Sequence, residues 1–256
     1  MTDWSRKWLL QFHPDKCHVL TLGEHHNIMH TQRYTIEGKE LEHVFEEKDL
    51  GVTIDSRLQF DEHVAEKIKK ANNMVGLIRR SFSYLDGHLF KKLFTTFVRP
   101  HLEYAQSVWS PHLQKYINAI EKVQIRATKL VDGLKHLEYE ERLKKLDLPT
   151  LAHRRTRGDL IEVFKHFHAY DQATIPETFQ TCDRTTRTHN FQLLSRKPKD
   201  GLRGLHTNFF YQRVIKIWND LPEKVVQAVD TNDFKEKLDE AMKDNPIVYN
   251  RIESDS

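Results

Sequence analysis

The stretch from Phe60 to Tyr84, FDEHVAEKIKKANNMVGLIRRSFSY, decides the fold. Its apolar residues recur at alternating steps of four and three, which places them on one face of a helix. At about 100° per residue, Lys69, Asn73 and Arg80 fall close together on the opposite face. An apolar seam opposed by a basic stripe favours a helix that packs on one side and meets a polyanion on the other. The seam consists of Val64, Ile68, Ala71, Val75, Ile78 and Phe82.

Further helices are expected on the C-terminal side of this stretch. An apolar helix from Leu89 to Val98 should stop at Pro100, because proline cannot continue a helix interior. The pattern predicts a third helix from about Tyr116 to Leu130. A short charged helix is expected over Tyr139–Leu146. Thr150 could cap a longer helix that runs to about Tyr170. Its apolar face is expected to consist of Leu160, Val163, Phe164 and Phe167, with Arg154 and Arg155 roughly opposite.

The residues before Phe60 indicate a few strands and one helix. Trp4 to Phe12 is typical of a short helix, and His18 to Leu22 of a strand. Two further apolar runs flank Gly38-Lys39, which is a plausible hairpin turn. Leu50 to Ile54 is predicted to be another strand.

These patterns predict an α+β chain that is mostly α. The region near the C-terminus shows two amphipathic helical patterns, the first ending in Trp218-Asn-Asp-Leu-Pro222, where the aromatic ring anchors the helix end and the proline stops it. The expected organisation is a strand and hairpin unit over 1–58, helices over 59–112 and 113–170, a basic linker over 171–207, C-terminal helices over 208–245 and a disordered tail over 246–256.

Composition sets limits on class and location. The chain has 256 residues, of which 38% are hydrophobic, and a formal net charge of only +3, so local clustering of charge is more informative than the total. No apolar run approaches the length of a membrane span, and the N-terminus carries no apolar signal-peptide core. The two cysteines suggest no disulfide framework. We expect a protein inside the cell, cytoplasmic or nuclear, that does not contact a membrane.

Enzymatic signatures are mostly absent from the sequence. There is no P-loop, no GxGxxG, no GxSxG and no adjacent Asp-Asp pair, and two-metal phosphoryl transfer needs carboxylates that converge on two cations. His25, His26 and His30 are close together, but a metal site needs a third ligand on a structured frame, and a solvated turn is the simpler interpretation. We therefore predict no metal site, no cofactor and no catalytic residue.

Nucleic acid is the partner that the basic residues suggest. Cations on a rigid helix can contact phosphates whatever the base sequence. The alternative is a solvated face whose charge is balanced by acidic neighbours such as Glu62 and Glu66. Lys16, just before the first predicted strand, could reach a phosphate or be a plain surface lysine. The helical candidates are Lys69, Asn73, Arg79, Arg80, Arg154, Arg155 and Arg157.

Several segments, in this order, resemble the reverse transcriptases of non-LTR retrotransposons of the jockey-like LINE group. They cover nearly the whole chain. The first segments are Trp8-Leu-Leu-Gln-Phe-His-Pro-Asp-Lys-Cys17, Lys48-Asp-Leu-Gly-Val-Thr-Ile54, Ala71 to Leu85 with Gly76-Leu-Ile-Arg-Arg-Ser-Phe82, Val98-Arg-Pro-His-Leu-Glu-Tyr104 and Val108-Trp-Ser-Pro111. The later segments are Gln124-Ile-Arg-Ala-Thr-Lys129, Tyr139-Glu-Glu-Arg-Leu143, Leu148-Pro149, Arg154-Arg155, Arg157-Gly-Asp159 and Phe209-Phe-Tyr-Gln-Arg-Val214 through Trp218-Asn-Asp-Leu-Pro222.

The resemblance implies roles for several residues. The first segment resembles the end of the palm, with His13 where the family has Asn, and Lys16 would lie near the phosphates of the incoming nucleotide. Leu50 and Gly51 resemble the primer-grip hairpin. The helices that follow resemble the thumb, which grips an RNA or DNA–RNA duplex, and then the region C-terminal to the polymerase core.

The same resemblance implies that catalysis is incomplete. The family's fingers, both catalytic carboxylate motifs and the magnesium that they bind would lie before Met1. We therefore expect a truncated fragment of an RNA-directed DNA polymerase that is not an enzyme by itself and retains at most backbone-level binding. Two alternatives stay open, namely an incomplete gene model of an active reverse transcriptase and a helical protein-interaction module.

Overall fold

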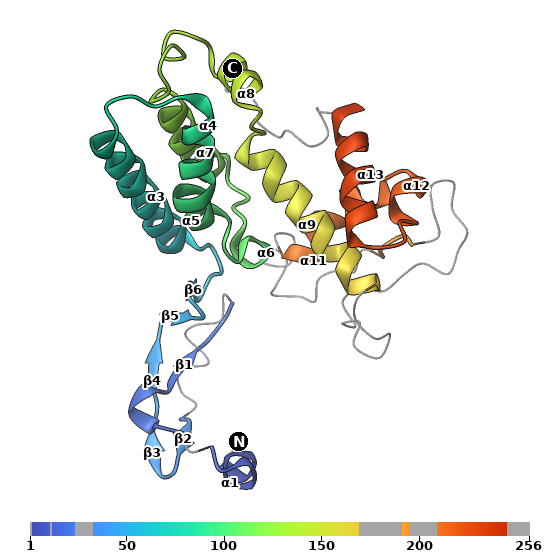
Figure 1. Cartoon of the computed structure of the whole chain (residues 1–256). Coiled ribbons are helices and arrows are strands. Elements are labelled where there is room, and N and C mark those ends of the chain that lie inside the picture. Colours follow the sequence, from blue (N-terminus) through green and yellow to red (C-terminus); the bar gives the residue numbers. More distant parts are fainter. Residues whose placement is uncertain (1, 11, 24–32, 169–190, 195–208, 245–256) are drawn as a thin grey trace. The chain divides into compact units, whose positions relative to one another are not determined.

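The computed structural model confirms a mostly helical α+β chain (Figure 1). It describes residues 2–10, 12–23, 33–168, 191–194 and 209–244. The chain divides into two compact units, of which the first holds the described residues up to His63 and the second those from Val64 onward. The basic linker predicted over 171–207 lies almost entirely outside the described residues, as do the tail over 246–256 and the histidines at 25, 26 and 30.

The first unit contains short elements and little core. Helix α1 (Thr2–Trp8) ends earlier than expected, and the 3-10 helix η1 (Pro14–Lys16) precedes strand β1 (His18–Leu20), which pairs in parallel with β4 (Glu42–Val44). Strands β2 (Thr35–Ile36) and β3 (Lys39–Glu40) form the expected hairpin. Its turn is formed by Glu37 and Gly38, one residue earlier than the predicted Gly38-Lys39. Glu37 and Gly38 both have positive φ, and Ile36 pairs with Lys39 across them.

A second hairpin in this unit is turned by Leu50 and Gly51. Strands β5 (Glu46–Asp49) and β6 (Val52–Asp55) are antiparallel, and Asp49 pairs with Val52 across a two-residue loop. Leu50 has φ +44° and Gly51 has φ +81°, the left-handed conformation that such a short loop requires. The predicted strand over Leu50–Ile54 therefore begins two residues later, and its partner β5 was not predicted, since Glu-Glu-Lys-Asp has no strand-forming side chains.

Helix α3 (Asp61–Ser81) confirms the central prediction. Val64, Ala71 and Ile78 of the predicted seam are buried, with at most 6% of each exposed. Phe82 follows the last helical residue and is 37% exposed, so the seam ends one turn early.

Pro100 does not stop the next helix, which corrects the sequence prediction. Helix α4 (Gly87–Leu93), capped by the Asp86 carboxylate, passes through a π-helical turn η2 (Phe94–Val98) into α5 (Arg99–Glu103). In the π turn the Arg99 N–H donates to the Phe94 carbonyl oxygen, five residues back. Pro100 then falls in the first turn of α5, where a missing N–H costs little.

The remaining helices of the first half of the second unit follow in order. They are α6 (Gln106–Trp109), α7 (Gln114–Thr128), α8 (Tyr139–Leu146) and α9 (Leu151–His168). Thr150 caps α9 as predicted, because its hydroxyl oxygen accepts from the His153 N–H at 3.1 Å. In Figure 1, α9 (yellow) lies between α5, α6 and α7 on one side and the C-terminal helices on the other.

The C-terminal helices enclose a hydrophobic core with α9. Helices α11 (Phe210–Asn219), α12 (Glu223–Val226) and α13 (Thr231–Asp244) pack against the apolar face of α9. The Phe164 and Phe234 rings stack at 4.3 Å, and Trp218 is fully buried beside Phe234. Pro222 stands at the N-cap of α12, so the predicted structural role of Trp218 to Pro222 is confirmed. Within the described residues, no helix combines the length and apolar character required to cross a membrane.

Candidate nucleic-acid interface

The predicted contacts on α3 all lie at the surface of the protein. Lys69, Asn73, Arg79 and Arg80 are all exposed. The acidic residues of α3 lie at its N-terminal end, where Glu66 pairs with Lys70, and no acidic residue follows Glu66 as far as Ser81. Among the described residues, no carboxylate forms an ion pair with Lys69, Arg79 or Arg80. The surface of α3 from Lys69 to Arg80 is therefore cationic and lies on one helix.

The predicted contacts in the first unit lie on exposed turns. Lys16 ends η1 and its side chain is exposed. Leu50, at the tip of the β5–β6 hairpin, is 83% exposed, which is unusual for an apolar side chain. The hairpin geometry at Leu50 and Gly51 agrees with what the resemblance implies, and its role in holding a primer stays a prediction.

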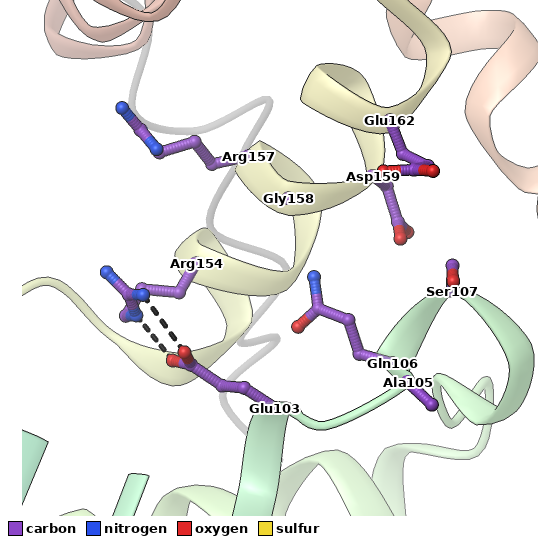
Figure 2. Close-up of a pocket in the computed structure, with 9 residues that line it drawn as sticks. All are labelled: Glu103, Ala105, Gln106, Ser107, Arg154, Arg157, Gly158, Asp159 and Glu162. Atoms are coloured by element: carbon purple, nitrogen blue, oxygen red, sulfur yellow. Dashed lines mark hydrogen bonds and ion pairs between the residues drawn. The ribbon is translucent and has the colours of Figure 1, made fainter. Parts of the chain in front are cut away.

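Arg154 forms part of an internal charge network. Its guanidinium group donates two hydrogen bonds to the Glu103 carboxylate on α5, from Nε to Oε1 and from Nη2 to Oε2, the second at 2.9 Å (Figure 2). Glu103 also lies 3.6 Å from Nε of Arg99. A bidentate pair of this kind holds α9 against α5 and occupies the donors that a phosphate would need.

Arg155 lies inside the protein, which corrects the prediction that it faces away from the packed side of α9. Only 5% of this residue is exposed. Burial lowers the pKa of its guanidinium group, and the nearby carboxylates of Glu121, Asp159 and Glu103 oppose that shift. Its Nη1 atom has no hydrogen-bond partner among the described residues. This side chain cannot meet a phosphate at the surface.

Arg157 joins α9 to the C-terminal helices. Its guanidinium group forms a bidentate pair with the Asp239 carboxylate on α13, with Nη2 and Oδ2 2.8 Å apart. Arg154, Arg157 and seven other residues line a polar pocket of about 270 Å³ between α9 and the α5–α6 corner (Figure 2). Arg154 and Arg157 therefore connect α9 to α5 on one side and to α13 on the other.

Sequence reasoning missed the residues that complete this junction. Arg213 on α11 donates to both carboxylate oxygens of Asp159, at 2.9 and 3.1 Å, and to the carbonyl oxygens of Gln106 and Ser107 at 3.3 and 2.9 Å. Burial raises the pKa of Asp159, and Arg213 opposes that shift. The signal was present, since Asp159 and Arg213 carry opposite charges within two of the motif segments quoted above, but their pairing is not visible from sequence.

A second buried polar cluster fixes the start of α9. Glu121 on α7 is 3% exposed, and its carboxylate accepts hydrogen bonds from the Leu151 N–H at 3.0 Å and from the Tyr139 hydroxyl. Burial raises the pKa of Glu121. Burial and the Glu121 carboxylate also raise the pKa of Tyr139, so the hydroxyl keeps its proton and donates. Within the part of the chain that the structure describes, no group of three or more His, Cys, Asp or Glu side chains could hold a metal ion.

Two curated proteins are similar to this chain over about half its length. One is an uncharacterized protein of Caenorhabditis elegans, 23% identical over 123 residues, or 47% of this chain and 60% of that protein. The other is the RNA-directed DNA polymerase from the mobile element jockey of Drosophila funebris, 28% identical over 138 residues, or 51% of this chain and 14% of the polymerase. No protein-family model and no solved structure matches the chain. The second similarity supports a retrotransposon-related origin.

Proposed function

We propose that this chain is a retroelement-derived fragment that binds the phosphate backbone of RNA or of a DNA–RNA duplex through α3 and has no polymerase activity of its own. The observation that carries the binding proposal is the exposed, cationic surface of α3 from Lys69 to Arg80. Because Arg154 and Arg157 are paired and Arg155 is buried, we leave these three residues out of the proposed interface.

The geometry of α3 suits a charged polymer. From Lys69 to Arg80 the helix rises about 16 Å, at 1.5 Å per residue. One strand of a duplex carries a phosphate charge about every 3.4 Å along the axis, so several phosphates lie within reach of this row. Contacts of this kind release condensed counterions and read no base sequence. Binding should therefore depend strongly on salt and weakly on sequence.

A salt titration of binding tests this proposal. The variant Lys69→Gln/Arg79→Gln/Arg80→Gln should reduce the slope of log K against log [salt] by about two to three, at about 0.9 for each phosphate that is no longer neutralised. The matched control is Lys216→Gln/Lys224→Gln/Lys243→Gln, which removes the same charge from exposed positions on α11, α12 and α13. Binding without salt dependence, or an equal effect of both variants, would contradict the proposal.

The proposal of no catalysis rests on the resemblance, which assigns the catalytic carboxylate motifs to no residue of this chain. The purified chain should not extend a primed RNA template in the presence of magnesium. Extension would favour the alternative of an active reverse transcriptase. Sequencing of the transcript upstream of Met1 tests the incomplete gene model, which requires an in-frame Asp-Asp motif.

Exposed apolar side chains on α1 favour a second candidate function, a protein-interaction module. Trp4 is 53% exposed and Trp8 is 59% exposed, and a large exposed apolar patch is typical of a protein-interaction site. A separately expressed upstream part of the jockey polymerase is a partner to test by sedimentation velocity. A complex that Trp4→Ser/Trp8→Ser abolishes would support this function, and no complex with the unmodified chain would exclude this partner.

A further inference from the structure

The outer face of α7 carries a second row of cations. Lys122, Arg126 and Lys129 are exposed and follow one another at steps of four and three, which places them on one face of the helix and its C-cap. Lys115 extends the same row by two turns, with its ammonium group 4.4 Å from the centre of the Tyr116 ring. The one acidic residue of α7, Glu121, is buried and engaged with Tyr139 and Leu151. The exposed face of α7 is therefore positive along its length.

This second row adjoins the cationic surface of α3 between Lys69 and Arg80. Nη1 of Arg126 donates to Oδ1 of Asn72 at 3.3 Å, which places α7 beside α3 in the second unit (Figure 1). Asn72 and Arg79 are seven residues apart, nearly two full turns, so both lie on the flank of α3 that faces α7. The exposed cations of the two helices thus belong to one surface.

Among the described residues, the positive charge of this surface is not balanced by acidic side chains, as it would be on an ordinary solvated face. Soluble proteins normally intersperse charges of both signs on exposed faces. Here α7 exposes no carboxylate, and α3 has none after Glu66. The nearby Asp132 carboxylate accepts a hydrogen bond from the Leu85 N–H at 2.6 Å and so helps to hold the chain together. An excess of one sign over two neighbouring helices matches a partner with a dense charge of the opposite sign.

We propose that α3 and α7 form a two-row basic surface for a nucleic-acid duplex, in which Lys122, Arg126 and Lys129 contact the second phosphate backbone. This inference rests on the proposed function and specifies the form of its ligand. One row of cations suffices for a single strand, whereas two rows on two helices can hold the two backbones that border a groove. A duplex also presents one charge per 1.7 Å of axis against 3.4 Å for each strand, so it gains more from the second row.

The test measures binding of a duplex and of a single strand of the same sequence as a function of salt. The variant Lys122→Gln/Arg126→Gln/Lys129→Gln should reduce the slope of log K against log [salt] for the duplex by about two to three. The slope for the single strand should change by less than about one. The triple variant of Lys216, Lys224 and Lys243 should change neither slope, and Asn72→Ala, which removes the bond to Arg126 but no charge, should leave the duplex slope unchanged.

The outcomes separate this inference from the proposed function. If the α3 variant lowers the duplex slope and the α7 variant does not, the two-row surface is wrong and the proposed function stands. If the unmodified chain shows no salt-dependent binding, the proposed function itself is wrong. Equal loss for duplex and single strand, or competition by polyglutamate at the same charge concentration, would also overturn the proposed ligand. Should the triple variant melt early, the single variants Lys122→Gln and Lys129→Gln should each lower the duplex slope by about one.

Discussion

The side-chain amide of Gln106 occupies the space that a Cβ atom on residue 158 would need. A Cβ built on Gly158 would overlap Nε2 of Gln106, and that nitrogen donates to the Arg155 carbonyl oxygen at 3.1 Å. Glycine in a helix interior costs about 1 kcal/mol relative to alanine. Glycine at position 158 therefore lowers the stability of α9 as a helix, but it allows the Gln106 side chain of α6 to pack closely against α9.

Gly158→Ala should lower the free energy of unfolding by about 1 kcal/mol. The new methyl group must displace the Gln106 amide, which leaves the Arg155 carbonyl group without this donor at a cost of about 1–3 kcal/mol, and the gain in helix propensity offsets part of that loss. Urea denaturation followed by circular dichroism measures the difference.

The control for this prediction is Gln106→Ala/Gly158→Ala, in which the clash is absent. The double variant should be more stable than the sum of the two single effects predicts, because the methyl group then has room. Additive effects would show that Gln106 and Gly158 are not coupled.

Arg213→Ala should destabilise the second unit by about 3–5 kcal/mol. The substitution removes the partner of Asp159, which is 6% exposed, and an unpaired buried carboxylate is costly. It also removes the donor to the carbonyl oxygens of Gln106 and Ser107. Thermal unfolding measures the effect. Arg213→Ala/Asp159→Asn should recover more than half of the loss, and failure to do so would show that the carboxylate is not the source of the cost.

The two faces of α9 differ in how well the sequence predicts their environment. Periodicity located its apolar face correctly, and Leu160, Val163 and Phe164 are all buried. Periodicity also implied that the opposite face of α9 is exposed to solvent. The sequence of one helix shows its apolar stripe but does not show how many other helices pack against it. Here α5, α6 and α7 pack on the polar side, so Arg154 and Arg155 meet carboxylates in place of solvent.

Pro100 and the β5 strand show two further limits. Proline was expected to end a helix, but the π turn before it shifts the hydrogen-bonding register so that Pro100 begins α5. The strand Glu46–Asp49 has no apolar alternation, and its pairing depends on the turn at Leu50 and Gly51. In both places backbone hydrogen bonding overrides the preference of the individual side chains.

Glu121 should make the protein less stable as the pH rises above about 4.5. Burial raises the pKa of Glu121 above its ordinary value of 4.5, so above this pH the folded state holds the proton more tightly than the unfolded state does. The contribution of Glu121 to the free energy of unfolding must then fall as pH rises through this window. In Glu121→Gln the amide oxygen can still accept a hydrogen bond from the Tyr139 hydroxyl, and the side chain cannot ionise.

The measurement for this prediction is urea denaturation of the two proteins between pH 4 and pH 7. Glu121→Gln should become more stable relative to the unmodified chain as pH increases. The pKa of Asp159 is also raised by burial. Its contribution to the pH dependence of stability is the same in both proteins and therefore cancels in the comparison. A constant difference across the range would contradict the assignment to Glu121.

Asn219→Ala should release the backbone of Leu193 from α11. The Asn219 side chain accepts from the Leu193 N–H at 2.8 Å and donates to the Leu193 carbonyl oxygen at 3.0 Å. Leu193 is 4% exposed, so both groups would lose their partner, at about 1–3 kcal/mol for each unsatisfied group. The Leu193 amide should exchange with deuterium at least about tenfold faster. Asn232→Ala, at an exposed position of α13, should leave that exchange rate unchanged.

Arg154→Gln/Arg157→Gln should weaken the fold without changing the salt dependence of duplex binding. Both guanidinium groups are paired in bidentate contacts with Glu103 and Asp239, so they release no counterions from a nucleic acid. The melting temperature should fall, because each substitution leaves a carboxylate without its partner. The slope of log K against log [salt], measured well below that melting temperature, should equal that of the unmodified chain. A slope lowered by about two would show that these arginines leave their carboxylates to bind phosphate, and the interface would then extend from α3 to α9.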